Sequence, residues 1–108
     1  MTVSAERRQH QRFDVPCRLR LELPDGHGIR ARTVNVSDGG AYFVATRPPA
    51  VGEEVSIRLG IPRDTANTFF LEQFAARAKV IRHDAPHEEG DGVGIALRFE
   101  KTLPLDLP

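Results

Sequence analysis

The feature that most constrains the fold of this chain is a series of short segments in which apolar and polar residues alternate, separated by turn-forming residues. Clear examples are CRLRLEL at 17–23, EVSIRLG at 54–60 and VGIALRF at 93–99. Alternation with a period of two places the apolar side chains on one face of an extended strand. The sequence PDGHG at 24–28 follows the first segment, and Asp-Gly strongly favours a tight turn. The pattern predicts antiparallel strands, each with one buried face.

Six segments of this kind can be distinguished, and two of them are less regular than the others. The alternation in IRARTVNV slips near Thr33, which predicts a β-bulge in that strand. In FFLEQFAARAKVIRH at 69–83, the first half is compatible with a helical turn or a strand, whereas the second half alternates as a strand does. We expect loops at 46–53, 61–68 and 85–92, and strands at 17–23, 29–36, 41–45, 54–60, the second half of 69–83, and 93–99.

The spacing of these segments predicts an all-β domain without a long helix. Six short strands are typical of small antiparallel barrels and sandwiches, and a six-stranded antiparallel barrel is favoured because closure leaves no exposed edge. We expect a flexible N-terminal arm at 1–12, which has almost no residue able to pack, a barrel at 13–100 and a short C-terminal tail at 101–108. Proline prevents a stable helix in the tail, so the tail is expected to dock as an extended segment.

The balance of charges argues against a general polyanion-binding protein. Lys and Arg total 15, and Asp and Glu also total 15, so the formal net charge is zero. Non-specific binding of DNA or RNA needs a net basic field, and we expect none here. The charge is uneven, however, because residues 1–32 hold seven arginines against four acidic residues. A local anion site is therefore expected near the N-terminal end.

The single cysteine and the lack of long apolar runs bear on where the protein works. Cys17 cannot form an internal disulfide, and its place on the apolar face of a strand predicts a buried small residue rather than a nucleophile. No apolar run approaches the roughly 18 residues that span a membrane, and the N-terminus lacks the apolar core of a signal peptide. We expect a soluble, cytoplasmic protein that does not insert into a membrane.

The residues that could carry catalysis do not form a recognisable catalytic pattern. His83 and His87 have a spacing of four, but Pro86 lies between them and disfavours the helix that would bring them together. Ser37 has no visible base and fits ordinary turn chemistry. The sequence GDGVG at 90–94 lacks the phosphate-loop pattern and precedes a strand. We expect no enzyme activity, no metal site and no cofactor.

Two short motifs flank the first two expected strands. Arg8 and Arg12 are separated by three residues in RRQHQRF, and the pattern Asn35-x-Ser37-x-x-Gly40 follows in NVSDGG. Either motif alone is weak, because the second would also suit a simple hairpin turn. Both motifs together, in this order, roughly twenty residues apart and on a six-strand pattern, are specific.

This combination resembles the PilZ domain, a bacterial receptor for cyclic di-GMP whose marks are RxxxR followed by [D/N]xSxxG. The sequence GVGIALRF at 92–99 is similar to the last barrel strand of the family, so the resemblance covers roughly residues 6–100. The family fold is a six-stranded antiparallel barrel, which agrees with the strand count reached from the alternation. Many members also end in a helix over the barrel mouth, and the residues after 100 are too few for a full one.

The resemblance implies a receptor that closes its arginine-rich arm over cyclic di-GMP and signals to a separate, unidentified partner protein. Arg forks pair with phosphate oxygens or with O6 and N7 of guanine, and glycine lets a base approach the backbone. An arginine directly before RxxxR implies that the ligand binds as an intercalated pair. The ligand-binding residues implied by the resemblance are Arg7, Arg8, Arg12, Asn35, Ser37 and Gly40.

Two other hypotheses stay open at this point. The main alternative is a PilZ-like scaffold that binds protein and no nucleotide, although family members of that kind usually lack the two motifs. A small barrel that binds single-stranded nucleic acid ranks last, because such a site needs stacking aromatic residues along a basic groove. Aromatic residues make up only 6% of this chain, with no Trp and one Tyr.

Overall fold

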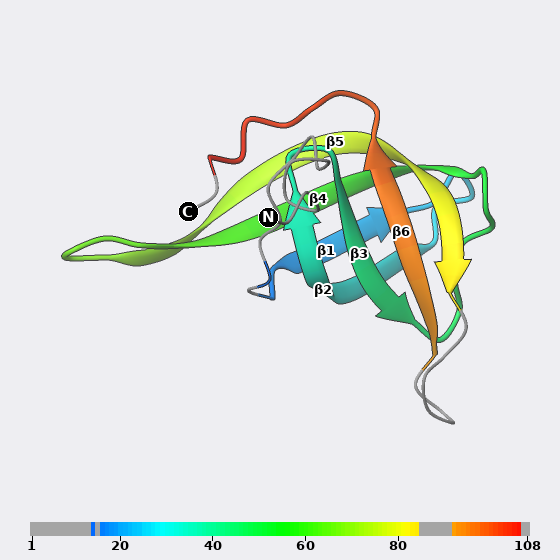
Figure 1. The fold of residues 1–108 in the computed structure, drawn as a ribbon, viewed down its shortest axis with the longest axis horizontal. Coiled ribbons are helices and arrows are strands. Elements are labelled where there is room, and N and C mark those ends of the chain that lie inside the picture. Colours follow the sequence, from blue (N-terminus) through cyan, green and yellow to red (C-terminus); the bar gives the residue numbers. More distant parts are fainter. Residues whose placement is uncertain (1–13, 15, 85–91, 107–108) are drawn as a thin grey trace, which may run out of the picture.

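In the computed structural model, which describes residues 14, 16–84 and 92–106, the described chain forms six β-strands and no helix. All neighbouring strands are antiparallel, and they close into a barrel in the order β1-β2-β3-β6-β5-β4 (Figure 1). The prediction of a six-stranded antiparallel barrel is therefore confirmed. The strands are β1 (Arg18–Glu22), β2 (Gly28–Ser37), β3 (Gly40–Ala45), β4 (Glu54–Asp64), β5 (Phe69–Asp84) and β6 (Val93–Phe99).

The β4–β5 hairpin is longer than the alternation predicted. Its ladder continues to the pair Asp64 and Phe69, so the expected loop at 61–68 was wrong for 61–64, and all of 69–83 is strand. Strand β1 pairs with β4 only as far as Gly60, so the end of the hairpin extends beyond the barrel wall (Figure 1). Pro62 lacks an N–H, and a strand that has a neighbour on one side only can accommodate it.

The predicted irregularity near Thr33 is confirmed as a shift in the β2–β3 register between Thr33 and Asn35. The Thr33 side chain is buried, and its Oγ1 accepts a 3.0 Å hydrogen bond from the Cys17 N–H. The Thr33 N–H in turn donates to the Cys17 carbonyl oxygen at 3.0 Å. These two bonds fix the residue before β1 to β2, two positions ahead of Asn35.

The barrel interior is filled by the alternate residues that the sequence pattern assigned to the inner face. Leu19 and Leu21 of β1 are buried between exposed neighbours, and Cys17 is buried as expected. The described part of the C-terminal tail docks on the barrel as predicted, but it is not extended throughout, because the Leu105 N–H donates to the Leu103 carbonyl oxygen and Asp106 has a φ of 51°. Leu105 is fully buried in the core cluster, and the Arg63 guanidinium donates hydrogen bonds to the carbonyl oxygens of Leu105 and Asp106.

Candidate functional site

Asn35, Ser37 and Gly40 come together where β2 turns into β3. Asp38 and Gly39 form the two-residue turn, and the Ser37 Oγ accepts a 3.3 Å hydrogen bond from the Gly39 N–H. All three motif residues line one hollow on the barrel surface, with a volume of about 520 Å³. This volume lies within the usual range for small-molecule sites, roughly 300–1,000 Å³. The structure therefore places the second motif on a surface that can receive a ligand.

Gly40 has a reason to be glycine within the fold itself. A Cβ at this position would overlap the backbone carbonyl oxygen of Leu97 in the neighbouring strand β6. Gly40 stands opposite Arg98 in the β3–β6 register, so the missing side chain allows the two backbones to pair this closely. Glycine is therefore needed at position 40 for the pairing of β3 with β6, whether or not a ligand base also approaches Gly40.

Most of the remaining wall of the hollow comes from β3, β5 and β6, and sequence analysis did not select these residues. The Tyr42 hydroxyl donates a 2.8 Å hydrogen bond to Asp84 Oδ2 and lies directly over Gly94, where a side chain would overlap it. Desolvation is the main cause of the raised pKa of Tyr42, and the hydrogen bond to Asp84 and the negative charge of Asp84 raise this pKa further. The further side chains that line the hollow include Ile81, Arg82, Arg98, Glu100 and Thr102.

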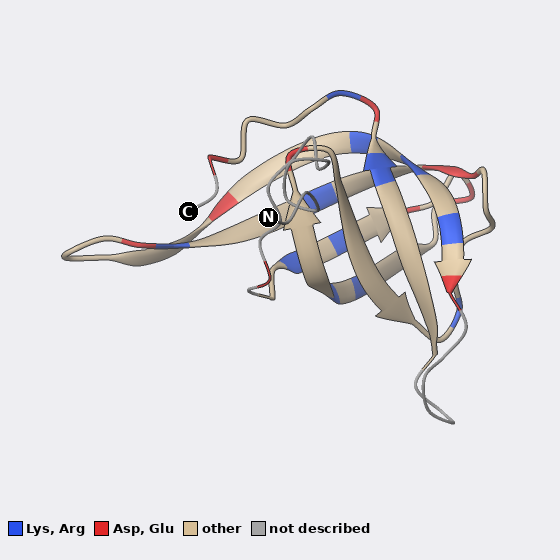
Figure 2. Ribbon diagram, in the orientation of Figure 1, with Lys and Arg blue, Asp and Glu red and all other residues tan. Residues whose placement is uncertain are grey.

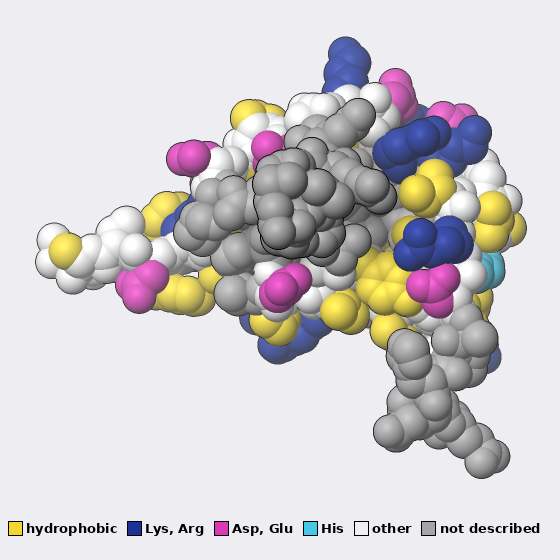
Figure 3. All heavy atoms as spheres, in the orientation of Figure 1, with side chains coloured by type: hydrophobic (Ala, Val, Ile, Leu, Met, Phe, Trp, Pro, Cys, Tyr) yellow, Lys and Arg dark blue, Asp and Glu magenta, His cyan; other side chains and the backbone are white. Residues whose placement is uncertain are grey.

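The two arginines of this wall differ in how their charge is used. Arg82 Nε pairs with Asp84 Oδ1 at 2.9 Å, so its charge is partly offset. Arg98 is exposed and forms no ion pair within the part of the chain that the structure describes. Figure 2 shows basic residues on β5 and β6, and Figure 3 shows basic side chains gathered beside an apolar area on the right of the visible face. The hollow thus combines a guanidinium, an aromatic hydroxyl, an amide and a serine hydroxyl.

The arginines of the first motif, Arg7, Arg8 and Arg12, lie outside the described residues, so their place at the site stays a prediction. The position of Cys17 nevertheless limits how far from the barrel these arginines can reach. The bonds between Cys17 and Thr33 anchor the start of the barrel beside the Asn35 end of β2. Arg12 is five positions before Cys17, and an extended chain covers about 17 Å over that length.

Cys17 and His83 are further residues whose side chains could take part in chemistry. Burial raises the pKa of the Cys17 thiol, which disfavours the nucleophilic thiolate. His83 Nε2 lies 2.6 Å from the Pro49 carbonyl oxygen, and His87 is outside the described residues. Over 14, 16–84 and 92–106, no cluster of three His, Cys, Asp or Glu residues could hold a metal ion.

The same described ranges contain no helix that is long and apolar enough to cross a membrane.

Comparison with known proteins identifies relatives of this barrel. The sequence matches the family described as the PilZ domain over residues 6–107. No curated protein sequence matches the chain. The fold resembles the Bacillus subtilis inhibitor of motility MotI/DgrA with a TM-score of 0.73 and 21% identity, covering 91% of this chain. This chain spans only 44% of that Bacillus protein.

Two solved structures of Escherichia coli YcgR with cyclic di-GMP share the same architecture. The PilZ domain of YcgR with cyclic di-GMP has a TM-score of 0.58 and 18% identity, covering 91% of this chain and 81% of that one. YcgR in complex with cyclic di-GMP has a TM-score of 0.61 and 20% identity, covering 86% of this chain and 38% of that one. At these identities the likeness shows a shared fold.

Proposed function

The chain belongs to the PilZ domain family, and we propose that it is a receptor for cyclic di-GMP that signals to a separate partner protein. The two motifs support this proposal, since both are intact and occur in the order and spacing of the family. In this proposal the arginine-rich arm closes over the ligand. The family match covers residues 6–107 and so includes both motifs.

One structural observation supports the proposal in addition to the two motifs. The Cys17 backbone, at the start of the barrel, is bonded to Thr33, two positions before Asn35, which supports an arm attached close to the hollow. An arm attached at this point can bring Arg12 and Arg8 over the hollow without any rearrangement of the barrel. The two motifs, which are separated in sequence, can therefore act on the same ligand.

The chemistry of the hollow suits a cyclic dinucleotide. Cyclic di-GMP has two phosphates and two guanines, and each phosphate carries about one negative charge. Arg8, Arg12 and Arg98 would provide bidentate donors for phosphate oxygens or for the Hoogsteen edge of guanine. Asn35 and Ser37 would hydrogen-bond the edges of the base, and the Tyr42 ring is an aromatic surface at the same hollow.

The direct test is calorimetric titration of the full chain with cyclic di-GMP, with GTP and cyclic di-AMP as controls. We expect saturable, selective binding of cyclic di-GMP at micromolar concentration or below. An Asn35→Ala/Ser37→Ala variant should bind more weakly while it retains the thermal unfolding transition of the unmodified chain. Absence of binding at tens of micromolar ligand would remove the proposal and favour the protein-interaction scaffold instead.

A further inference from the structure

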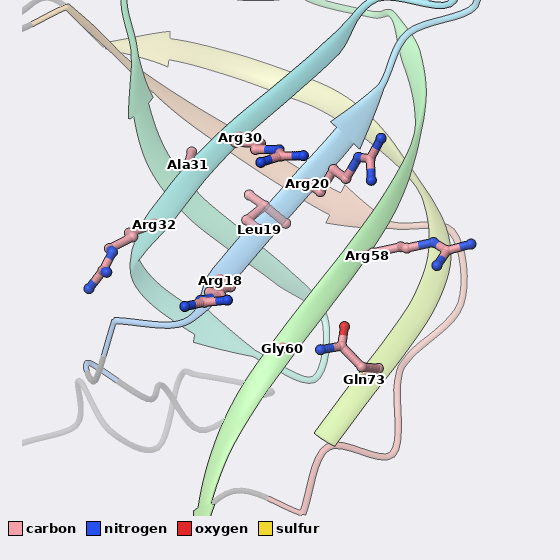
Figure 4. Close-up of a pocket in the computed structure, with 9 residues that line it drawn as sticks. All are labelled: Arg18, Leu19, Arg20, Arg30, Ala31, Arg32, Arg58, Gly60 and Gln73. Atoms are coloured by element: carbon pink, nitrogen blue, oxygen red, sulfur yellow. The ribbon is translucent and has the colours of Figure 1, made fainter. Parts of the chain in front are cut away.

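A second charged surface lies on the barrel away from the candidate nucleotide site. Five exposed arginines from three neighbouring strands surround a hollow of about 740 Å³ (Figure 4). Strand β1 is central, with β2 on one side and β4 on the other. We refer to these residues as the arginine surface, and they are Arg18, Arg20, Arg30, Arg32 and Arg58.

The strand register places these arginines directly opposite one another. Arg18 faces Arg32 across the β1–β2 ladder, and Arg20 faces Arg30 in the same ladder. Arg20 also faces Arg58 across the β1–β4 ladder, so a row of three arginines crosses three strands. Like charges at directly opposed positions destabilise a sheet. The fold therefore maintains an arrangement that costs stability in the absence of an anion.

No carboxylate of the described chain forms an ion pair with these arginines. The arginines that do form ion pairs, Arg63, Arg77 and Arg82, belong to other parts of the barrel. None of the five residues of the arginine surface has an ion-pair partner in 14, 16–84 and 92–106. Glu22 is the acidic residue of β1, and its register partners are Gly28 and Ser56 rather than an arginine.

One position in the second row of the arginine surface has no side chain. Gly60 of β4 is buried and stands between Arg18 and Gln73 in the register. A Cβ on Gly60 would lie 3.3 Å from Gln73 Nε2, which is a tight contact, so the glycine lets the Gln73 side chain lie close to β4 at the edge of the hollow. A partner side chain that enters here would meet guanidinium donors and one amide.

We propose that the arginine surface is a docking site for a short acidic segment, rich in Asp or Glu, of a partner protein. Arginine forks match carboxylates in bidentate geometry, which a lysine cannot do. Positions two residues apart along a strand are about 7 Å apart and three strands span about 10 Å, so the surface can hold only a few anionic groups.

The size of the arginine surface and the residues that line its hollow distinguish between classes of anionic partner. A nucleic-acid duplex presents a long line of phosphates, and single strands are held by stacking on aromatic residues. None of the residues that line this hollow is aromatic. A membrane surface is flat, whereas these arginines surround a hollow (Figure 4). A few carboxylates on an extended segment fit both the size and the concave shape.

The arginine surface is distinct from the candidate nucleotide site. The arginine surface uses β1, β4 and the first half of β2, whereas the nucleotide site uses the end of β2 together with β3, β5 and β6. The inference rests on the proposed function only in taking this acidic partner to be the downstream target. Binding of an acidic segment by itself does not require cyclic di-GMP.

The experiment measures binding of a fluorescent twelve-residue peptide of alternating Glu and Thr to the full chain by anisotropy. The matching Gln-Thr peptide, a twelve-nucleotide oligothymidylate and phosphatidylglycerol vesicles serve as alternative probes. The test variant is Arg20→Gln/Arg58→Gln. The matched control, Arg47→Gln/Lys101→Gln, removes the same charge from exposed positions outside this hollow.

We expect the Glu-Thr peptide to bind, with affinity that falls as salt rises, and the test variant to bind at least tenfold more weakly than the control variant. An Arg18→Gln/Arg32→Gln variant should behave like the test variant, which gives an independent measurement if one of them folds poorly. Cyclic di-GMP affinity should be unchanged in the test variant, so failure of one proposal can be distinguished from failure of the other.

Three outcomes would overturn the inference. The first is no binding of the Glu-Thr peptide, or equal loss of binding in the control variant. The second is tighter binding of the oligothymidylate or the vesicles through the same arginines. The third is loss of cyclic di-GMP binding in the test variant with its fold intact, which would assign these arginines to the nucleotide site.

Discussion

The Leu103 N–H donates a 2.9 Å hydrogen bond to the carbonyl oxygen of Asp38, and this bond joins the C-terminal tail to the turn of the second motif. The Phe99 N–H donates in the same way to the Gly39 carbonyl oxygen at 2.9 Å. Two residues beyond Leu103, the Leu105 side chain is fully buried in the barrel core. The tail therefore supports the turn that positions Ser37, and its attachment depends on the burial of an apolar side chain.

Replacing Leu105 by Ala should destabilise the barrel, because the side chain is fully buried and the change leaves a cavity. Substitutions of this kind cost about 2–5 kcal/mol. Chemical denaturation should show this loss of unfolding free energy, whereas Pro104→Ala at an exposed neighbouring position should change it little. Equal stability of the two variants would mean that the tail does not pack as described.

Replacing Gly40 by Ala should also destabilise the fold, even in the absence of ligand. The new Cβ would overlap the Leu97 carbonyl oxygen, and overpacking typically costs about 1–3 kcal/mol. Gly28→Ala is the matched control in the same sheet, because its Cβ would lie 3.8 Å from the nearest atom, the Leu21 carbonyl oxygen. The melting temperature should fall clearly in the first variant and little in the second. If both variants melt alike, Gly40 has no steric role in strand pairing.

The strands that could be predicted from the sequence are those with one face in the barrel interior. In β1 the apolar residues of the alternation are the buried ones, so the pattern directly reports burial. Beyond the barrel wall this relationship is lost. Phe69 and Phe70 are adjacent and both exposed, at 66% and 44%, because the end of the hairpin has no inner face. At 61–64 the alternation is also broken, because Gly60 and Ile61 are adjacent and both buried, so the sequence could not distinguish strand from loop there.

The candidate site was predictable only where its residues are close together in the sequence. Ser37 and Gly40 belong to one hairpin turn, and the turn brings them together whatever the remaining fold is. Tyr42 and Asp84 are 42 positions apart and meet because β3 and β5 both pair with β6. A register shift between Val80 and Arg82 further changes which β5 residues face this hollow. Such neighbours follow from strand order and register, which local patterns do not specify.

Replacing Arg8 or Arg12 by Ala should weaken binding of cyclic di-GMP about ten- to a hundredfold. Each substitution removes a charge-assisted contact worth roughly 1.5–3 kcal/mol. Calorimetric titration provides the measurement, and Arg47→Ala, which removes the same charge from the exposed β3–β4 loop, is the control. Ser37→Ala should have a smaller effect. Normal binding by both arm variants would show that the arm takes no part in recognition.

The position before the first motif should determine how many ligand molecules bind. We expect two molecules of cyclic di-GMP per chain, as an intercalated pair that carries about four negative charges. Arg7 would offset charge that Arg8 and Arg12 alone do not, and its guanidinium can stack on a guanine for roughly 0.5–2 kcal/mol. In Arg7→Leu the calorimetric stoichiometry should fall from two to one. A value of one in the unmodified chain, or no change in the variant, would contradict this assignment.

Removing the Tyr42 hydroxyl should change the response of the barrel to alkaline pH. The raised pKa of Tyr42 means that the folded state favours the neutral phenol, because ionisation would occur in a partly desolvated position beside Asp84. This contribution to stability is therefore fully present below the ordinary tyrosine pKa of about 10 and is lost as pH rises through the raised value. Tyr42→Phe should cost about 0.5–1.5 kcal/mol near pH 7 through the lost hydrogen bond. Above pH 10 the unfolding free energy of Tyr42→Phe should fall less steeply than that of the unmodified chain. Both proteins keep Cys17, so the difference between their pH-dependent denaturation series reports on Tyr42 alone. Parallel pH profiles would show that the hydroxyl titrates as it does in the unfolded chain.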